Sequence, residues 1–196
     1  MTSAIPTPRV ALFWGATLLT VLALAACEPR KQEPPADPAA AVPAAEAPAL
    51  TDPEIAHIAV TANAIDSAMG ELAKTKARSS AVKGFAQTMI TDHGGVNRQA
   101  VQLAQRLKVT PQENAVSRQL QQGADEARAS LESRNGAEFD RAYMQREVEY
   151  HQAVLDALDQ ALIPNARNGE LKALLEGVRP AFVAHLERAK QIQGSL

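Results

Sequence analysis

The sequence has few cysteines and few aromatic residues, and neither sign of charge is in large excess. It holds one cysteine in 196 residues, and only 4% of its residues are aromatic. Because a disulfide needs two cysteines, no disulfide within the chain can stabilise it. Acidic and basic residues are nearly balanced, with a formal net charge of −2, which argues against a nucleic-acid-binding surface.

The single cysteine, Cys27, ends a hydrophobic run near the N-terminus. The run "VALFWGATLLTVLALAAC" follows Arg9 and is short for a membrane-spanning helix, so residues 1–26 are predicted to be a secretory signal peptide. Its end, "LAAC", resembles a bacterial lipobox, in which the signal is cut and the cysteine is acylated. We therefore expect lipidated Cys27 to anchor the mature chain to a membrane, with an ordinary signal peptide as the alternative.

Residues 27–50 are rich in proline and alanine, a composition that predicts an extended tether rather than a packed core. Glu28 directly after the cysteine resembles the outer-membrane sorting preference of Gram-negative lipoproteins. The expected location is therefore the cell envelope, at the periplasmic face of the outer membrane. Residues 51–194 are expected to form a single folded domain.

Within that domain, apolar residues recur at spacings of three and four, and no alternating strand pattern is present. Capping and breaking residues separate five expected helices, of which the third is mostly polar and the last contains Pro180, which should bend it. They begin at Thr51–Glu54, Ser79 or Ser80, and about Pro111, Ala137 and Glu170. This pattern predicts an all-α fold: a ferritin-like four-helix bundle with an additional helical crossover segment, or alternatively an up-and-down bundle with the fifth helix packed outside.

Three of the four histidines lie on or beside an apolar stripe, whereas His57 flanks a helix start and is expected to face solvent. At about 1.5 Å per residue, His93 lies about 21 Å past the first turn, His151 about 22 Å before the last turn and His185 about 27 Å past that turn, along helices about 40 Å long. Asp66 occupies the corresponding level of the first helix. One carboxylate and three imidazoles are therefore expected to converge near mid-height.

Such a donor set suits copper, zinc or iron, with Asp92 and Glu147 as carboxylates that support the ligating rings. The helices lack the paired Glu-x-x-His pattern of di-iron carboxylate bundles. No nucleophile stands beside a base, and Gly94 and Gly95 lie within a helical pattern rather than in a phosphate-binding loop, so no enzymatic activity is expected. These two glycines cost a helix about 1 kcal/mol each, which predicts a close helix approach or a kink beside His93.

Three segments together resemble the bacterial domain-of-unknown-function family 4142, over about Thr51 to Gln193. They are "GELAKTKARSSAVKGFAQTMITDHGGVNRQAVQLAQRLKVTP", "GAEFDRAYMQREVEYHQAVL" and "FVAHLERAKQI". The resemblance implies a secreted or lipid-anchored protein with a ferritin-like bundle and no settled activity. It also implies a glutamate in the first helix where this chain has the shorter Asp66, and recurrent positions at Asp92, His93, Phe139, Asp140, Tyr143, His151 and His185.

Two functions follow from these patterns. The first is a lipid-anchored envelope protein whose bundle is a structural or interaction module, with a buried His/Asp layer that fixes its packing. The alternative is transition-metal binding at Asp66, His93, His151 and His185, for metal buffering or stress tolerance in the envelope. The membrane is the expected partner through Cys27, no nucleic acid is expected, and the sequence names no protein partner.

Overall fold

The computed structural model describes residues 49–196, and over this range it is all-helical, without a strand. The predicted signal peptide, Cys27 and nearly all of the tether lie outside the described residues. None of the described helices is both long and apolar enough to cross a membrane. The elements are α1 Asp52–Lys76, α2 Ser80–Leu107, α3 Ala115–Glu132, α4 Gly136–Ala157, a π-helical turn Leu158–Leu162, α5 Ile163–Asn165 and α6 Gly169–Gln193.

Side chains at the helix ends explain most of these boundaries. Thr51 and Glu54 form a capping box at the start of α1, with Pro53 in the first turn. The buried Asp140 on α4 accepts hydrogen bonds from the backbone N–H groups of Arg78 and Ser79, at 2.9 and 2.8 Å, just before α2 begins. These bonds satisfy backbone donors that a helix start leaves without internal partners.

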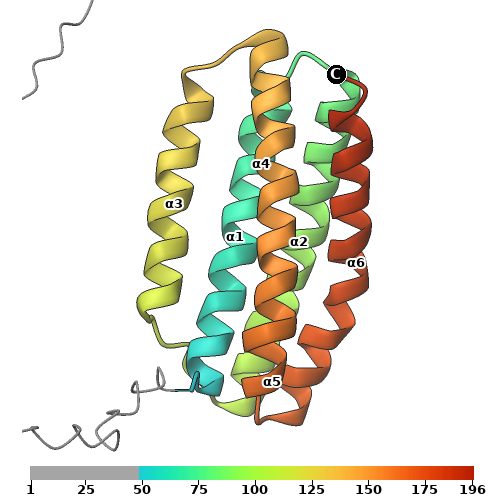
Figure 1. The fold of residues 1–196 in the computed structure, drawn as a ribbon. Helices are drawn as coiled ribbons and strands as arrows, with labels where there is room; N and C mark the ends of the chain where they lie inside the picture. Colours follow the sequence, from blue (N-terminus) through green and yellow to red (C-terminus); the bar gives the residue numbers. More distant parts are fainter. Residues whose placement is uncertain (1–48) are drawn as a thin grey trace, which may run out of the picture. The chain divides into compact units, whose positions relative to one another are not determined.

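The long helices lie side by side along one bundle axis (Figure 1). α1 and α2 form one antiparallel hairpin, and α4 and α6 form the other. In the chain, α3 connects the two hairpins; it runs along the length of the bundle and packs against α1 and α4 (Figure 1). Because α3 returns the chain to the end of the bundle where α2 began, α2 and α4 run in the same direction. The core is therefore made by α1, α2, α4 and α6, with α3 covering one side.

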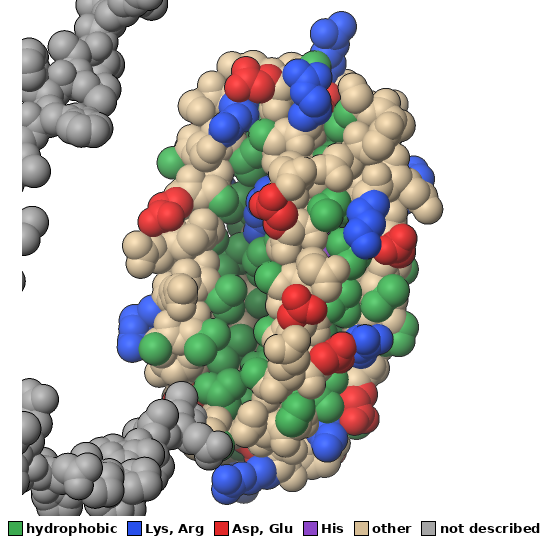
Figure 2. All heavy atoms as spheres, in the orientation of Figure 1, with side chains coloured by type: hydrophobic (Ala, Val, Ile, Leu, Met, Phe, Trp, Pro, Cys, Tyr) green, Lys and Arg blue, Asp and Glu red, His purple; other side chains and the backbone are tan. Residues whose placement is uncertain are grey.

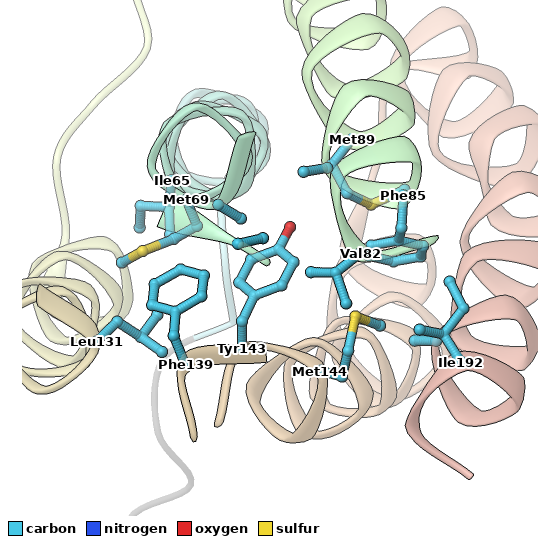
Figure 3. Packing of buried hydrophobic residues seen from close by; sticks show 14 of the residues in the cluster. Ile65, Met69, Val82, Phe85, Met89, Leu131, Phe139, Tyr143, Met144 and Ile192 are labelled. Atoms are coloured by element: carbon cyan, nitrogen blue, oxygen red, sulfur yellow. The ribbon is translucent and has the colours of Figure 1, made fainter. Parts of the chain in front are cut away.

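Two hydrophobic clusters fill this core. One packs Met69, Phe85, Met89, Tyr143 and other residues near the α1–α2 turn (Figure 3), and the second fills the other end with mostly aliphatic residues. Along each core helix, buried polar residues come where one cluster gives way to the other. These residues, which we call the polar layer, are Asn63, Asp66, His93, Glu147, His151 and His185.

The structure corrects two local expectations. The third helix begins at Ala115 rather than near Pro111, because Asn114 caps it and its side chain also donates to the Glu54 carbonyl at 3.2 Å. The expected close approach at Gly94 and Gly95 is wrong, since a Cβ added there would meet only the flexible Arg98 side chain at 3.6–3.8 Å. The close approach occurs at Gly70, where a Cβ would lie 2.9 Å from the Ala86 carbonyl oxygen on α2.

Candidate metal centre

Three imidazoles from three different helices form a triangle in the polar layer. The ring centroids of His93 on α2, His151 on α4 and His185 on α6 are 5.3–5.5 Å apart in every pair. One nitrogen of each ring lies within 4.8 Å of a nitrogen of the other two. We call these three side chains the histidine cluster. All three are buried, with at most 6% of the residue surface exposed.

His93 is held from two sides. Its Nδ1 lies 3.0 Å from the side-chain oxygen of Asn63, whose amide nitrogen donates to the Ala59 carbonyl. Because that oxygen can only accept, Nδ1 donates and Nε2 carries the lone pair of the neutral ring. The ring also stacks on Phe182, with centroids 5.0 Å apart and planes 6° from parallel. The orientation of His93 is therefore fixed by buried groups.

His151 has the same tautomer for a different reason. Its Nδ1 lies 3.0 Å from the backbone carbonyl of Glu147 one helical turn earlier, which again can only accept. Its Nε2 points to the Asp66 carboxylate, 3.7 Å from Oδ2. Burial lowers the pKa of His151 to about 4, so the ring is neutral near pH 7.

His185 is anchored by its other nitrogen. Nε2 lies 2.9 Å from Oδ2 of Asp92 on α2, so that Nε2 donates to a carboxylate and Nδ1 carries the lone pair of the neutral ring. Burial lowers the pKa of His185, although the bond to Asp92 works in the opposite direction. In all three rings, one nitrogen donates to a fixed acceptor and the other presents a lone pair.

A buried ion-pair group adjoins the histidine cluster. The fully buried Asp66 has Oδ2 3.0 Å from His93 Nε2 and Oδ1 2.8 Å from a guanidinium nitrogen of Arg146. The same nitrogen of Arg146 contacts Oε1 of the fully buried Glu147. Burial alone would raise the pKa of Asp66, but His93, when its ring is protonated, and the charge of Arg146 hold that pKa below its ordinary value. Burial and the Asp66 charge raise the pKa of Glu147 well above its ordinary value.

Several buried polar atoms of this region find no hydrogen-bond partner among residues 49–196. In the polar layer they are the inner nitrogens of the histidine cluster, Oδ2 of Asp66 and Oε2 of Glu147. His93 Nε2 and Asp66 Oδ2 lie 3.0 Å apart, but neither atom has a hydrogen-bond partner among residues 49–196. The hydroxyl of buried Tyr143 also has no partner in this range, and Figure 3 shows it pointing away from α4 toward α1 and α2. Buried polar atoms without partners are costly, so a group of them requires an explanation.

The dimensions of the triangle fit one transition-metal ion. A triangle with sides of 5.3–5.5 Å has its centre about 3.1 Å from each ring centroid. An ion bonded to a ring nitrogen at about 2.0–2.1 Å lies about 3.2 Å from the centroid of that ring. Three neutral imidazoles and one carboxylate are ligands that zinc, copper and iron accept. The arrangement can therefore bind such an ion without moving the helices.

All four residues predicted as ligands lie in one buried layer, but their potential ligand atoms form two sets within 4.8 Å, the histidine cluster on its own and Asp66 with Glu147 and His151. Glu147 lies beside His151 as expected. Asp92 does not support its sequence neighbour His93 but bonds to His185 on another helix. His57 lies outside the layer and is half-buried, with Nδ1 3.4 Å from the Thr61 hydroxyl.

Two members of the region were not predicted. Asn63 lies three residues before Asp66, a spacing that places both on the same face of α1. That spacing was a usable signal, because a polar residue on the buried face needs a partner. Arg146 gave no comparable signal, since an arginine on an amphipathic helix is ordinarily exposed.

Comparison with known proteins gives one match. A family model described as "Domain of unknown function (DUF4142)" matches residues 37–192. No curated protein and no solved structure matches the chain significantly. The match covers every residue of the polar layer.

Proposed function

The chain belongs to the DUF4142 family, whose function is unknown, and we propose that its bundle binds one transition-metal ion through the histidine cluster and Asp66. The observation that carries the proposal is the direction of the three rings. Each donates its outer N–H to Asn63, to a backbone carbonyl or to Asp92, and each has a buried inner nitrogen with no hydrogen-bond partner among residues 49–196. Ligating histidines characteristically hold their second nitrogen in this way.

The same observation weighs against a purely structural role for the polar layer. A buried polar network specifies packing well when every member has a partner. Here at least five buried atoms of the layer have none among the described residues. An ion bound at the centre would give partners to the three inner nitrogens, and Asp66 lies within 3.0–3.7 Å of two of them.

We further infer that the domain is a ferritin-like four-helix bundle in which α3 is the crossover between two helical hairpins. The parallel course of α2 and α4 supports this topology, because an up-and-down bundle would make consecutive core helices antiparallel (Figure 1). From the lipobox-like motif at Cys27, we propose that the protein is anchored by lipid in the cell envelope. Its role there would be to buffer the metal or to protect the envelope from metal stress, without catalysis.

Elemental analysis and competition with a chromogenic chelator test the metal site directly. Purified protein should bind one Zn²⁺, Cu²⁺ or Fe²⁺ per chain. Loss of a group that supports a ligating residue weakens metal binding by about 10–100-fold. His151→Gln removes a ligand itself, so it should weaken binding by more than that. His57→Gln is the matched control, because it removes a histidine outside the polar layer, and it should bind like the wild type.

Thermal unfolding gives a second measure. An ion at 100 times its Kd stabilises a protein by about 2.7 kcal/mol. For a domain of this size, that stabilisation raises Tm by about 5–10 °C. If none of the three ions binds stoichiometrically and none raises Tm, the metal site is refuted and the structural module becomes the better interpretation.

A further inference from the structure

Two surface grooves lead toward the polar layer from opposite sides. The first lies between α2 and α6, has a volume of about 580 Å³, and is lined by Ala81, Gly84, Asp92, Ala184, His185 and five other residues. The second lies under α3, has a volume of about 400 Å³, and is lined by Ile65, Leu120, Gly123, Arg146, Tyr150 and five others. We call them the α2–α6 groove and the α3 groove. Either could connect the buried site with solvent.

The α3 groove is closed to a cation. It is lined mainly by hydrophobic side chains, and Figure 2 shows a strip of such side chains between α3 and α4. At its inner end, Arg146 covers both buried carboxylates and lies over the Tyr150 ring, 4.3 Å from its centroid. Glu149 also lines this groove, but a metal ion arriving here would meet the Arg146 guanidinium before it reached Asp66 or Glu147.

The α2–α6 groove is lined by one carboxylate, Asp92, and one guanidinium, Arg188, and it is Asp92 that contacts the histidine cluster. The Asp92 side chain is 44% exposed and lies 2.9 Å from His185, whose own side chain is 8% exposed. A cation that reaches Asp92 in this groove has an imidazole directly behind that carboxylate. Attraction by a partly exposed carboxylate raises the local concentration of cations at the mouth of a site.

The three rings also differ in their freedom to move. His93 is held by buried Asn63 and by stacking on Phe182, and His151 is held by the carbonyl of its own helix. Turning either ring would leave a buried polar group without its bond, which is costly. His185 is held by the half-exposed Asp92, and water can replace that bond when the ring turns. His185 is therefore the ring best placed to move.

We propose that the metal ion reaches and leaves the histidine cluster through the α2–α6 groove, with Asp92 as its first contact and His185 as the ring that turns to pass it inward. This inference rests on the proposed metal site. Asp92 then has a double role, since it attracts the ion and afterwards holds the N–H of the ligating His185. The proposal also explains why a carboxylate that supports a buried ligand is itself at the surface.

Two glycines provide a matched pair of variants. Gly84 in the α2–α6 groove and Gly123 in the α3 groove are both helical and exposed, and a Cβ added to either meets no atom within 4 Å. Leucine at either position should therefore fill its groove without disturbing the fold. Neither glycine belongs to the metal site, so the equilibrium affinity should not change.

The experiment follows binding of Co²⁺ by its visible absorption in a stopped-flow instrument, and release of Co²⁺ to excess chelator. We expect Gly84→Leu to slow uptake and release alike by about tenfold or more, a barrier higher by about 1.4 kcal/mol. Gly123→Leu should match the wild type. Asp92→Asn should slow uptake and weaken its dependence on ionic strength, because a charge that attracts the ion is lost. Asp125→Asn on exposed α3 is the control for that loss of charge.

The outcomes separate the two proposals. A stoichiometric ion whose rates change in Gly123→Leu, or in neither leucine variant, would overturn the α2–α6 route and leave the metal site standing. Failure of the wild type to bind any ion would overturn both. Slower exchange in Gly84→Leu alone, at unchanged Kd, would establish the route.

Discussion

Arg146 offers the sharpest test of how the polar layer is held in the absence of metal. One of its guanidinium nitrogens contacts both Asp66 and Glu147, and only 13% of its side-chain surface is exposed. Arg146→Met keeps most of the aliphatic stem but removes the charge. It leaves a buried carboxylate, Asp66, without the guanidinium charge that helps to hold its pKa low in spite of burial. Breaking such a buried pair on one side costs about 3–5 kcal/mol.

The expected loss is measurable by thermal or urea unfolding of chelator-treated protein. At about 2–4 °C per kcal/mol for a domain of this size, Tm should fall by about 6–20 °C. The control is Arg179→Met, which breaks a bidentate ion pair with Asp159 whose two side chains are 44% and 43% exposed. That pair is solvated on both sides, so its loss should change stability little.

Two further measurements identify the cause of the loss. The difference between wild type and Arg146→Met should be full at pH 7 and should shrink as the pH falls toward and below 3.8, the ordinary pKa of aspartate, because a protonated Asp66 needs no cation. Saturating Zn²⁺ should stabilise Arg146→Met more than the wild type, since the ion supplies the missing positive charge. If metal-free Arg146→Met lost no more stability than Arg179→Met, our account of the buried charges would be refuted.

Three other predictions concern packing, an outer partner and pH. Gly70→Ala should destabilise the protein by about 1–3 kcal/mol, because its Cβ would meet the Ala86 carbonyl at 2.9 Å. Gly94→Ala should instead stabilise it by up to about 1 kcal/mol, and urea unfolding measures the free energy of unfolding of both variants. Asn63→Ala should weaken metal binding by about 10–100-fold in a chelator competition, since it frees His93 Nδ1; wild-type affinity would contradict this role. Metal-free protein should lose stability as the pH falls from 6.5 to about 4, by up to about 3 kcal/mol, because burial lowers the pKa of His151 and the unfolded chain therefore binds the proton more readily. His151→Gln should flatten that slope, and an unchanged slope would assign it to other groups.

Much of the fold could be predicted because local sequence patterns determine where the helices begin and which faces are buried. Thr51, Pro53 and Glu54 mark the start of α1 within one residue, since a capping box and an N-terminal proline act within one turn. The start of α3 was missed because it depends on distant contacts. Pro111 alone suggests a first turn, but the Gln112 N–H bonds to the Pro53 carbonyl and Asn114 bonds to Glu54, which holds this segment to α1 and delays the helix.

The candidate site was predictable to the same extent. The histidines were found because helical periodicity places them on the buried face, and the rise per residue places them at one height. Which carboxylate supports which ring was not predictable, since Asp92 is adjacent to His93 in sequence but bonds to His185 across the α2–α6 contact. Gly70 was likewise missed, because close approach of two helices depends on their packing and not on the composition of either one.

The charges of the polar layer indicate that the domain can fold without a bound ion. Near pH 7, burial keeps His151 neutral and raises the pKa of Glu147, and the Asp66 carboxylate, whose pKa is low, is paired with the Arg146 guanidinium without the help of an ion. Hydrophobic clusters on both sides of the layer hold the four core helices together without help from the site. In a structural zinc site, by contrast, the free energy of metal binding is the free energy of folding. A bundle that is stable in both states can release its ion without unfolding, which is the behaviour that reversible metal buffering requires.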